Sequence, residues 1–353
     1  MREKFIDMVA CPDDACRSNL RFAEVAERHP GREDDIIAGA LECIGCGKRY
    51  PIEKGIARFV DRSLYRDTWS WLWKRFYHVR GQTRDGTDWI REAVLERPRW
   101  TPDFLKDKSL MEFGCGSGND TEVLADVVKT LISLELSDAV DVIPEHLLAR
   151  DNVLVLQADL LHVPVKRDLV DLGFCHRVIM HTPDPEASFR SMAPHVKPGG
   201  EFFLHSYDTH LRSMLQFKYI YRPITKRLST KTVYRILSVI GPVLYPLVGL
   251  LRRVGLFRKP VKLLIPFCNY SRELVRDGSK LNARDRYEWN MLLTLDALTP
   301  MYDNPNSPET MQRWFEQSGY EQIELLGRNP VIMKARRAPQ ALPHSVPAQA
   351  VAG

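Results

Sequence analysis

Short apolar runs and amphipathic stretches alternate along the middle of the chain. The apolar runs, which predict strands, lie at 109–113, 131–135, 153–157, 169–175 and 201–206. The stretches with helical spacing lie at 119–128, 138–149 and 185–196. Near the end come one more predicted helix and two more apolar runs, at 308–318, 320–326 and 330–336. Alternating strands and helices are typical of an α/β domain with a parallel sheet.

The rest of the chain has other patterns. Residues 1–60 show short alternating strands with glycine turns, and 61–108 hold five of the seven tryptophans. A mostly helical pattern at 207–305 interrupts the sheet before its last two strands. The expected parts are a ribbon-like domain (1–60), an aromatic helical linker or substrate lid (61–108), a core (109–206), a helical cap insertion (207–305), the C-terminal part of the core (306–336) and a disordered tail (337–353).

The composition is that of a globular protein. The 353 residues carry 50 basic and 45 acidic side chains, which gives a formal net charge of +5, and 44% are hydrophobic. Collagen-like, disordered and disulfide-scaffold classes are therefore excluded for the bulk of the chain. The N-terminus lacks the apolar stretch of a signal peptide, so we expect a cytoplasmic protein.

Four of the seven cysteines lie in the first 46 residues, as the pairs Cys11 with Cys16 and Cys43 with Cys46. Thiolate pairs from two turns can complete a tetrahedral four-sulfur site for zinc. The first pair is C-x4-C rather than the usual C-x2-C. The alternative is a ribbon held by its own packing, with reduced cysteines.

A glycine-rich loop, E-F-G-C-G-S-G at 112–118, leads from the first strand of the core into a helix. Glycines let a backbone turn sharply and let a ligand approach closely. Glu135 ends the next strand about 20 residues later, where a carboxylate can accept both ribose hydroxyls of a nucleoside. Asp159 follows the third strand and can accept an adenine amino group. Helix capping is the alternative role for both acids.

Five motifs in this order resemble class I S-adenosylmethionine-dependent methyltransferases: E-F-G-C-G-S-G, S-L-E-L-S, Q-A-D-L, D-L-G-F-C-H-R-V-I-M-H-T-P-D-P and H-V-K-P-G-G-E-F-F. The resemblance is strong over 109–206 and weaker over 308–336. It implies a Rossmann-like sheet of seven strands that binds S-adenosyl-L-methionine, preceded here by a zinc ribbon and carrying a helical insertion before the last two strands. An NAD-dependent dehydrogenase would instead have G-x-G-x-x-G.

The resemblance also assigns roles to residues. The glycines of the loop would hold the methionine part of the cofactor, Glu135 the ribose, and Asp159 with Leu160 the adenine. The full set of expected cofactor-binding residues is Glu112, Gly114, Cys115, Gly116, Gly118, Glu135, Leu136, Asp159, Leu160 and His176.

His181 is the first candidate for a general base, because it follows the fourth strand at the edge of the crevice, where family members often carry a histidine. A structural histidine is the alternative. Tyr302, in a late D-x-L-x-P-x-Y-D segment, is a second candidate, and His176, His205 and Tyr207 are weaker ones. The run I-M-H-T-P-D-P also resembles ubiquinone-biosynthesis O-methyltransferases, whose E-x-x-E-H pattern is associated with a divalent metal. Arg177 and Met180 stand at the glutamate positions, so no catalytic metal is expected.

The second cysteine pair, in L-E-C-I-G-C-G-K-R-Y-P-I-E-K-G-I, is similar to the small zinc-ribbon activator proteins that partner some methyltransferases. The resemblance implies that such a module is fused to the enzyme here. It would support the enzyme or present substrate rather than perform chemistry.

Positive charge is concentrated in the insertion. Between Asp208 and Glu273 lie 13 basic residues and no acidic one, which leaves a charge of −8 on the rest of the chain. Among them is an uncharged run, 236–251, interrupted by Pro242 and Pro246 and shorter than the about 20 residues of a membrane span. A basic, apolar, proline-broken segment favours adsorption to an anionic membrane surface through 209–272. RNA binding and a buried cap over the active site are the alternatives.

The expected activity is methyl transfer to an oxygen of a small or lipid-linked metabolite, such as a quinone precursor, a glycan or a polyketide-like intermediate. A carbon or nitrogen acceptor atom is the alternative. One alternative is an RNA methyltransferase that holds phosphates with the ribbon and the basic insertion. The other is a non-catalytic scaffold that keeps the cofactor fold. The expected location is the cytoplasm, with peripheral attachment to the inner face of the membrane.

Overall fold

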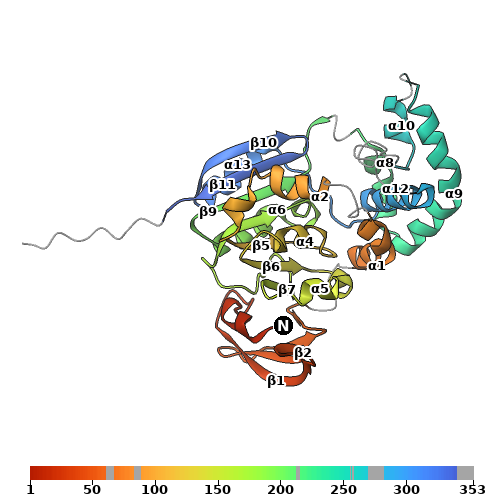
Figure 1. The fold of residues 1–353 in the computed structure, drawn as a ribbon. Coiled ribbons are helices and arrows are strands. Elements are labelled where there is room, and N and C mark those ends of the chain that lie inside the picture. Colours follow the sequence, from red (N-terminus) through yellow and green to blue (C-terminus); the bar gives the residue numbers. More distant parts are fainter. Residues whose placement is uncertain are drawn as a thin grey trace, which may run out of the picture.

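The computed structural model describes residues 1–60, 67–82, 89–211, 215–254, 256, 258–268 and 282–339. Within them a sheet of eleven strands has the order β1-β2-β3-β4-β7-β6-β5-β8-β9-β11-β10 (Figure 1). The α/β fold class is confirmed. The expected count of seven strands is wrong for the whole sheet, because the four ribbon strands extend the seven strands of the core. The expected tail lies outside the described residues from 340 onward.

Seven strands form the core of the sheet. They are β5 (Ser109–Phe113), β6 (Thr130–Glu135), β7 (Val153–Gln157), β8 (Val170–Cys175), β9 (Val196–Ser206), β10 (Tyr320–Arg328) and β11 (Val331–Arg337). Pairing is parallel from β7 to β9, and β11 and β10 add antiparallel strands at the end. Because parallel strands point the same way, their carboxyl ends meet along one edge of the sheet. β11 includes Arg337, the first residue of the expected tail.

Alternate side chains of the strands enter two separate cores. Met111 of β5 belongs to a cluster that includes Phe189 of α6 and Phe315 of α13, whereas the neighbouring Leu110 belongs to one that includes Leu124 of α4. Strand side chains alternate between faces, so a sheet covered by helices on both faces needs continuous apolar strands. The covering helices are α4 (Asn119–Ala125), α5 (Glu145–Leu148), α6 (Pro185–Met192) and α13 (Pro308–Gln317).

The predicted helix at 138–149 is wrong as a single element. The chain forms a 3-10 helix, Asp138–Val142, and then α5, with Pro144 at the N-cap between them. Proline lacks the N–H that an uninterrupted helix would use, and its ring restricts the preceding residue. Three shorter helical segments precede β5: α2 (Trp89–Arg91), a π-helix (Glu92–Glu96) and α3 (Pro102–Leu105).

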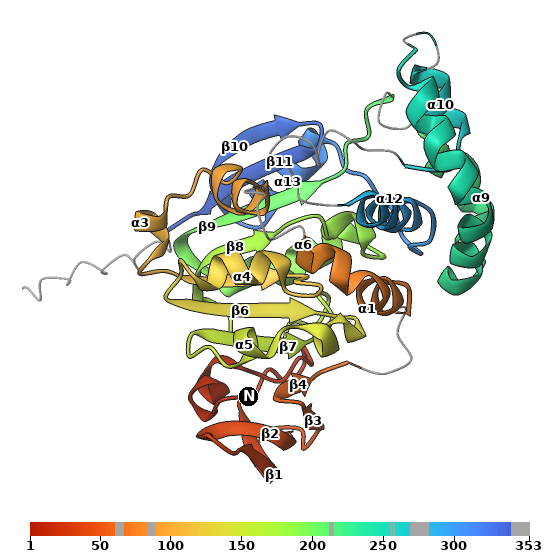
Figure 2. The same cartoon turned by 45° about the vertical axis from the view of Figure 1, so that its right-hand side comes forward.

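The N-terminal ribbon continues the core sheet (Figure 2). After a 3-10 helix, Glu3–Met8, its strands are β1 (Leu20–His29), β2 (Arg32–Cys43), β3 (Arg49–Glu53) and β4 (Ile56–Arg58). β4 runs parallel to β7, with Ala57 opposite Leu156 and Arg58 opposite Gln157. Without the ribbon, β7 would be an edge strand with unpaired backbone groups, so this pairing covers that edge.

The helical cap lies beside the carboxyl edge of the sheet, with α9 outermost (Figures 1 and 2). Its helices are α1 (Asp67–Gln82), α8 (Phe217–Thr225), α9 (Thr230–Leu251), α10 (Arg258–Leu264) and α12 (Ala283–Leu298). They share a third apolar cluster, which includes Leu72 of α1, Leu237 of α9 and Leu295 of α12. The cap therefore has its own core and joins α1, from the predicted lid, to the predicted insertion.

The expected break in the apolar run does not occur. α9 is continuous over 22 residues with Pro242 and Pro246 inside it. Each proline leaves one carbonyl of the preceding turn without its helical partner. Both prolines are exposed, so water can bond to the carbonyls on that side. Among the described residues, α9 is long and apolar enough to cross a membrane by length and composition alone.

Candidate functional site

The loop after β5 is built on three glycines in the left-handed region. The φ angles of Gly114, Gly116 and Gly118 are 83°, 55° and 86°. A Cβ on Gly114 would lie 2.4 Å from Val178 Cγ2, and a Cβ on Gly116 would lie 2.7 Å from the Trp73 ring. Both the φ values and the close neighbours therefore require glycine at these positions.

Glu135 lies beside this loop, at the end of β6. Its carboxylate accepts hydrogen bonds from the backbone N–H of Gly116 at 2.9 Å and of Ser137 at 2.8 Å. Burial raises the pKa of Glu135, and these donors oppose that shift. A carboxylate has about four acceptor positions, so the bonds leave capacity for two ligand hydroxyls. The arrangement fits the ribose-binding role predicted for Glu135.

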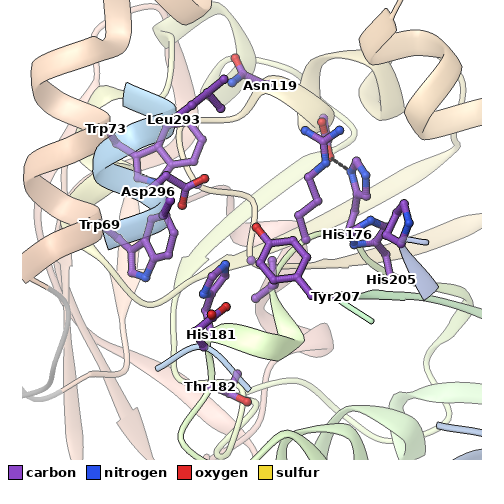
Figure 3. Close-up of a pocket in the computed structure, with 18 of the residues that line it drawn as sticks. Trp69, Trp73, Asn119, His176, His181, Thr182, His205, Tyr207, Leu293 and Asp296 are labelled. Carbon is purple, nitrogen blue, oxygen red and sulfur yellow. Dashed lines mark hydrogen bonds and ion pairs between the residues drawn. The ribbon is translucent and has the colours of Figure 1, made fainter. Parts of the chain in front are cut away.

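A cavity of about 520 Å³ opens at the carboxyl edge of the sheet (Figure 3). Eight of the predicted cofactor-binding residues line it: Gly114, Cys115, Gly116, Glu135, Leu136, Asp159, Leu160 and His176. The cap supplies the opposite wall through Trp69 and Trp73 of α1, Lys218 and Tyr219 of α8, and Trp289, Leu293 and Asp296 of α12. The cavity thus has one wall formed by the loops that follow the core strands and one largely aromatic wall formed by the cap.

Glu112 and Gly118, the other two predicted cofactor-binding residues, are not among the lining residues. Glu112 is buried beneath the loop, where its Oε2 accepts hydrogen bonds from Thr121 Oγ1 at 2.8 Å and from Ser133 Oγ at 2.7 Å. Burial raises the pKa of Glu112 to about 8, so its carboxyl group holds a proton at neutral pH. Glu112 therefore links β5 to α4 through Thr121 and to β6 through Ser133.

His181 lies in the cavity with its edge toward the Trp69 ring (Figure 3). Its Nδ1 is 3.2 Å from the backbone carbonyl oxygen of Tyr302. A carbonyl can only accept, so Nδ1 carries the proton and Nε2 is left as an acceptor. Burial lowers the pKa of His181, which keeps the ring neutral at pH 7. Tyr302 is not among the lining residues, whereas its neighbour Asp303 is.

Two charged contacts in the cavity are absent from the sequence prediction. His176 Nδ1 lies 2.6 Å from Asp120 Oδ2, and Lys218 Nζ lies 2.9 Å from Asp303 Oδ2. Asp120 lies in the first turn of α4, 56 positions before His176, and no sequence motif links the two residues. Lys218 and Asp303 are 85 positions apart and share no motif. Among the described residues, Asp296 Oδ1 is buried in the cavity wall without a hydrogen-bond partner.

The four N-terminal cysteines come together at the end of the ribbon where β1 begins and β2 ends. Cys11 Sγ is 3.7 Å from Cys46 Sγ, Cys16 Sγ is 3.5 Å from Cys43 Sγ, and all four sulfurs lie within 4.8 Å of one another. A tetrahedral site with Zn–S bonds of about 2.3 Å separates its sulfurs by about 3.8 Å. The donor set and spacing therefore fit a zinc ion, despite the wider first pair.

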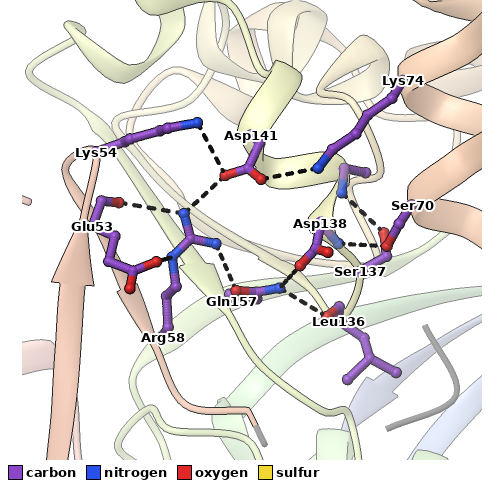
Figure 4. A network of polar contacts seen from close by, with 11 residues as sticks. Glu53, Lys54, Arg58, Ser70, Lys74, Leu136, Ser137, Asp138, Asp141 and Gln157 are labelled. Atoms are coloured by element: carbon purple, nitrogen blue, oxygen red, sulfur yellow. Dashed lines mark hydrogen bonds and ion pairs between the residues drawn. The ribbon is translucent and has the colours of Figure 1, made fainter. Parts of the chain in front are cut away.

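A polar network connects the ribbon to the cavity wall (Figure 4). Arg58 of β4 donates to Gln157 Oε1 at 2.7 Å and to Asp141 Oδ1 at 2.9 Å. Lys74 of α1 contacts the second oxygen of Asp141 at 3.1 Å. The segment after β6, which carries the cavity residue Leu136, is thus held from both the ribbon and the cap.

Comparisons with known proteins agree with this geometry. Residues 111–204 match the family model described as a methyltransferase domain. A ubiquinone biosynthesis O-methyltransferase of Coxiella burnetii (strain RSA 493 / Nine Mile phase I) is 26% identical over 113 residues, which is 31% of this chain and 48% of that protein. One of Vibrio parahaemolyticus serotype O3:K6 is 29% identical over 125 residues, 35% of this chain and 52% of that protein.

Among solved structures, magnesium protoporphyrin IX methyltransferase from Synechocystis PCC 6803 is similar with a TM-score of 0.42 and 13% identity. That alignment covers 79% of this chain and 100% of the other. The chain spans about half the length of the curated relatives it matches. The family match covers the glycine loop, Glu135, Asp159 and His181. Residues 111–204 are therefore a methyltransferase domain, of the S-adenosylmethionine-dependent class that the sequence motifs resemble.

Proposed function

We propose that this protein transfers a methyl group from S-adenosylmethionine to an oxygen atom of a small or lipid-linked metabolite. One observation supports the proposal that the acceptor atom is oxygen: His181 presents an unprotonated Nε2 in the same cavity as the glycine loop. An acceptor hydroxyl must lose its proton during methylation, and a neutral histidine can accept it. The curated relatives named as O-methyltransferases support this choice of acceptor atom.

The residues that would hold the cofactor are those of the sheet edge. The backbone of Gly114 and Gly116 lines the cavity, Glu135 can accept two ribose hydroxyls, and Asp159 with Leu160 lines the adenine side. Bound S-adenosylmethionine supplies an electrophilic methyl group. The chain then needs only to orient the acceptor and to remove its proton.

The cap provides the acceptor's surroundings. Trp69, Trp289 and Leu293 offer apolar and aromatic surface, while Asp296 and the Lys218–Asp303 ion pair offer polar contacts. Such a mixture suits an aromatic or lipid-like acceptor that carries a few hydroxyl groups. Of the expected acceptor classes, quinone precursors and polyketide-like intermediates meet this description more closely than glycans, which carry many hydroxyl groups.

The test is methyl transfer from S-adenosylmethionine carrying a tritiated methyl group. The purified chain would be incubated separately with a bacterial lipid extract, an aqueous metabolite extract and total RNA. We expect label in the lipid or aqueous pool, incorporated about 10²- to 10⁴-fold more slowly with His181→Gln. Label in RNA would instead support an RNA methyltransferase. Cofactor binding without label in any pool would support a non-catalytic scaffold.

A further inference from the structure

The outermost helix of the cap, α9, is apolar on a buried face and also on an exposed face. One face, with Val233, Leu237, Gly241 and Val248, is buried against the cap. The other consists of apolar side chains spaced three or four residues apart and exposed to solvent. We call this exposed stripe the α9 outer face: Ile236, Val239, Ile240, Val243, Leu247 and Leu250.

The exposure of the α9 outer face is large for aliphatic residues. Val239 is 79% exposed, Val243 68% and Leu250 61%. A surface helix of a globular protein normally turns polar side chains to water, and contiguous exposed apolar patches mark interaction sites. α8 and α10 add further exposed aliphatic side chains, Ile224 and Leu264.

Basic side chains surround the α9 outer face at both ends. Lys226, Arg227, Lys231 and Arg235 are exposed before or in its first turns, and Arg253 and Lys262 are exposed beyond its last turn. The sequence from 209 to 272 contains no acidic residue. An apolar centre between basic ends complements a bilayer surface, where acyl chains lie beneath anionic headgroups.

Other occupants fit the α9 outer face less well. RNA binding uses stacking aromatic rings, whereas this stripe is aliphatic. A span across the bilayer would require both faces of α9 to leave the protein, yet one face packs against α12 and α1 in the cap core. A second copy of this chain would place two basic rims against each other, which like charges oppose.

We propose that the α9 outer face docks this protein on an anionic lipid bilayer, with α9 lying in the plane of the headgroups. The apolar side chains enter the boundary between headgroups and acyl chains, and the basic ends contact anionic lipid. This docking surface is separate from the cavity and does not depend on the proposed methyl transfer. It would bring the cap, which forms one wall of the cavity, close to acceptors held in the membrane.

The test is co-sedimentation of the full chain with vesicles, one set of phosphatidylcholine and one of phosphatidylcholine and phosphatidylglycerol in equal parts. We expect binding to the anionic vesicles, with strong loss in Val239→Glu/Val243→Glu. Val25→Glu, at an exposed valine on β1, is the matched control and should bind like the wild type. Lys226→Gln/Lys231→Gln should weaken binding by about tenfold or more, whereas Lys106→Gln/Lys129→Gln should not.

Each outcome is decisive for the membrane proposal. Equal sedimentation of the Val239→Glu/Val243→Glu variant and the wild type would overturn it, as would the absence of wild-type binding to anionic vesicles. Binding to RNA that Val239→Glu/Val243→Glu leaves intact, without vesicle binding, would replace lipid with a nucleic acid. A dimer in lipid-free solution that the same substitutions dissociate would replace lipid with a second copy. S-adenosylhomocysteine binding, measured on each variant, reports separately on the fold and the cavity.

Discussion

Arg58, the last residue of β4 in the ribbon, donates a hydrogen bond of 2.7 Å to the Oε1 atom of Gln157, the last residue of β7. Gln157 Nε2 in turn donates to the backbone carbonyl of Leu136 at 3.2 Å and to Asp138 Oδ1 at 3.1 Å. Leu136 lines the cavity directly after Glu135. Through the Gln157 side-chain amide, and through Asp141, the ribbon therefore contacts the segment after β6 on the cofactor side of the cavity.

Replacing Arg58 should loosen that wall. In Arg58→Ala, Gln157 and Asp141 lose charge-assisted hydrogen bonds, so the segment after β6 becomes more mobile. Ligand binding must then order this segment, which costs conformational entropy and weakens affinity. We expect S-adenosylhomocysteine to bind roughly three- to tenfold more weakly, as measured by calorimetry. Arg21→Ala, on the ribbon surface away from β7, is the control. Unchanged affinity in Arg58→Ala would show that the network has no part in cofactor binding.

Zinc should be required for the ribbon to remain folded. Treatment with a strong chelator, or the substitution Cys43→Ser, should remove the ion and lower the melting temperature, because four thiolates left without metal cannot hold the two turns together. Metal analysis by atomic absorption should give about one zinc per wild-type chain and much less for Cys43→Ser. Cys268→Ser, at a buried cysteine in the cap, should keep its zinc. A wild-type chain purified without metal and with the same melting temperature would contradict the site.

His181 should control turnover and leave cofactor affinity unchanged. His181→Gln removes the free Nε2 acceptor, and loss of a general base lowers kcat by about 10²- to 10⁴-fold. Because burial lowers the pKa of His181, the rate should rise with pH through an apparent pKa below the usual 6.5 and be flat at neutral pH. His162→Gln, at an exposed histidine, should match the wild type. An equal loss of S-adenosylhomocysteine affinity in His181→Gln would indicate a structural histidine.

Glu112 should make the fold less stable as pH rises. Its pKa is about 8 in the folded chain and near 4.5 when unfolded. Its stabilising contribution is complete below pH 4.5 and is lost as pH rises through 8, because the unfolded chain releases the proton first. Glu112→Gln cannot ionise, so its melting temperature should fall a few degrees less than that of the wild type between pH 6 and pH 8.5. Glu145→Gln, at an exposed carboxylate, should fall in parallel with the wild type.

The sequence pattern predicts those parts of the fold that depend on residues close together in the chain. The strand at 153–157 is fully buried, and a run of four apolar residues followed by glutamine predicts it. The pairing of β4 with β7 joins positions about a hundred residues apart through two residue pairs, and no short pattern carries it. The sheet was therefore predicted with seven strands rather than eleven.

The site divides in the same way. Gly116 and Glu135 belong to motifs that predict a shared crevice, and the Gly116 N–H lies 2.9 Å from Glu135 Oε2. Lys218 and Asp303 come from the insertion and the segment after it, and only packing of the cap on the core brings them together. The continuity of α9 was also missed, because proline's cost within a helix depends on whether water can reach the carbonyls it frees.

The central claim, that this cavity binds S-adenosylmethionine through the glycine loop and Glu135, is tested most directly by calorimetric titration. Wild-type protein should bind S-adenosylhomocysteine, and Glu135→Ala should lose most of that affinity, because the ribose hydroxyls lose their acceptor. Glu145→Ala, at an exposed carboxylate on α5, should bind like the wild type. No binding by folded wild-type protein, or equal binding by Glu135→Ala, would contradict the account.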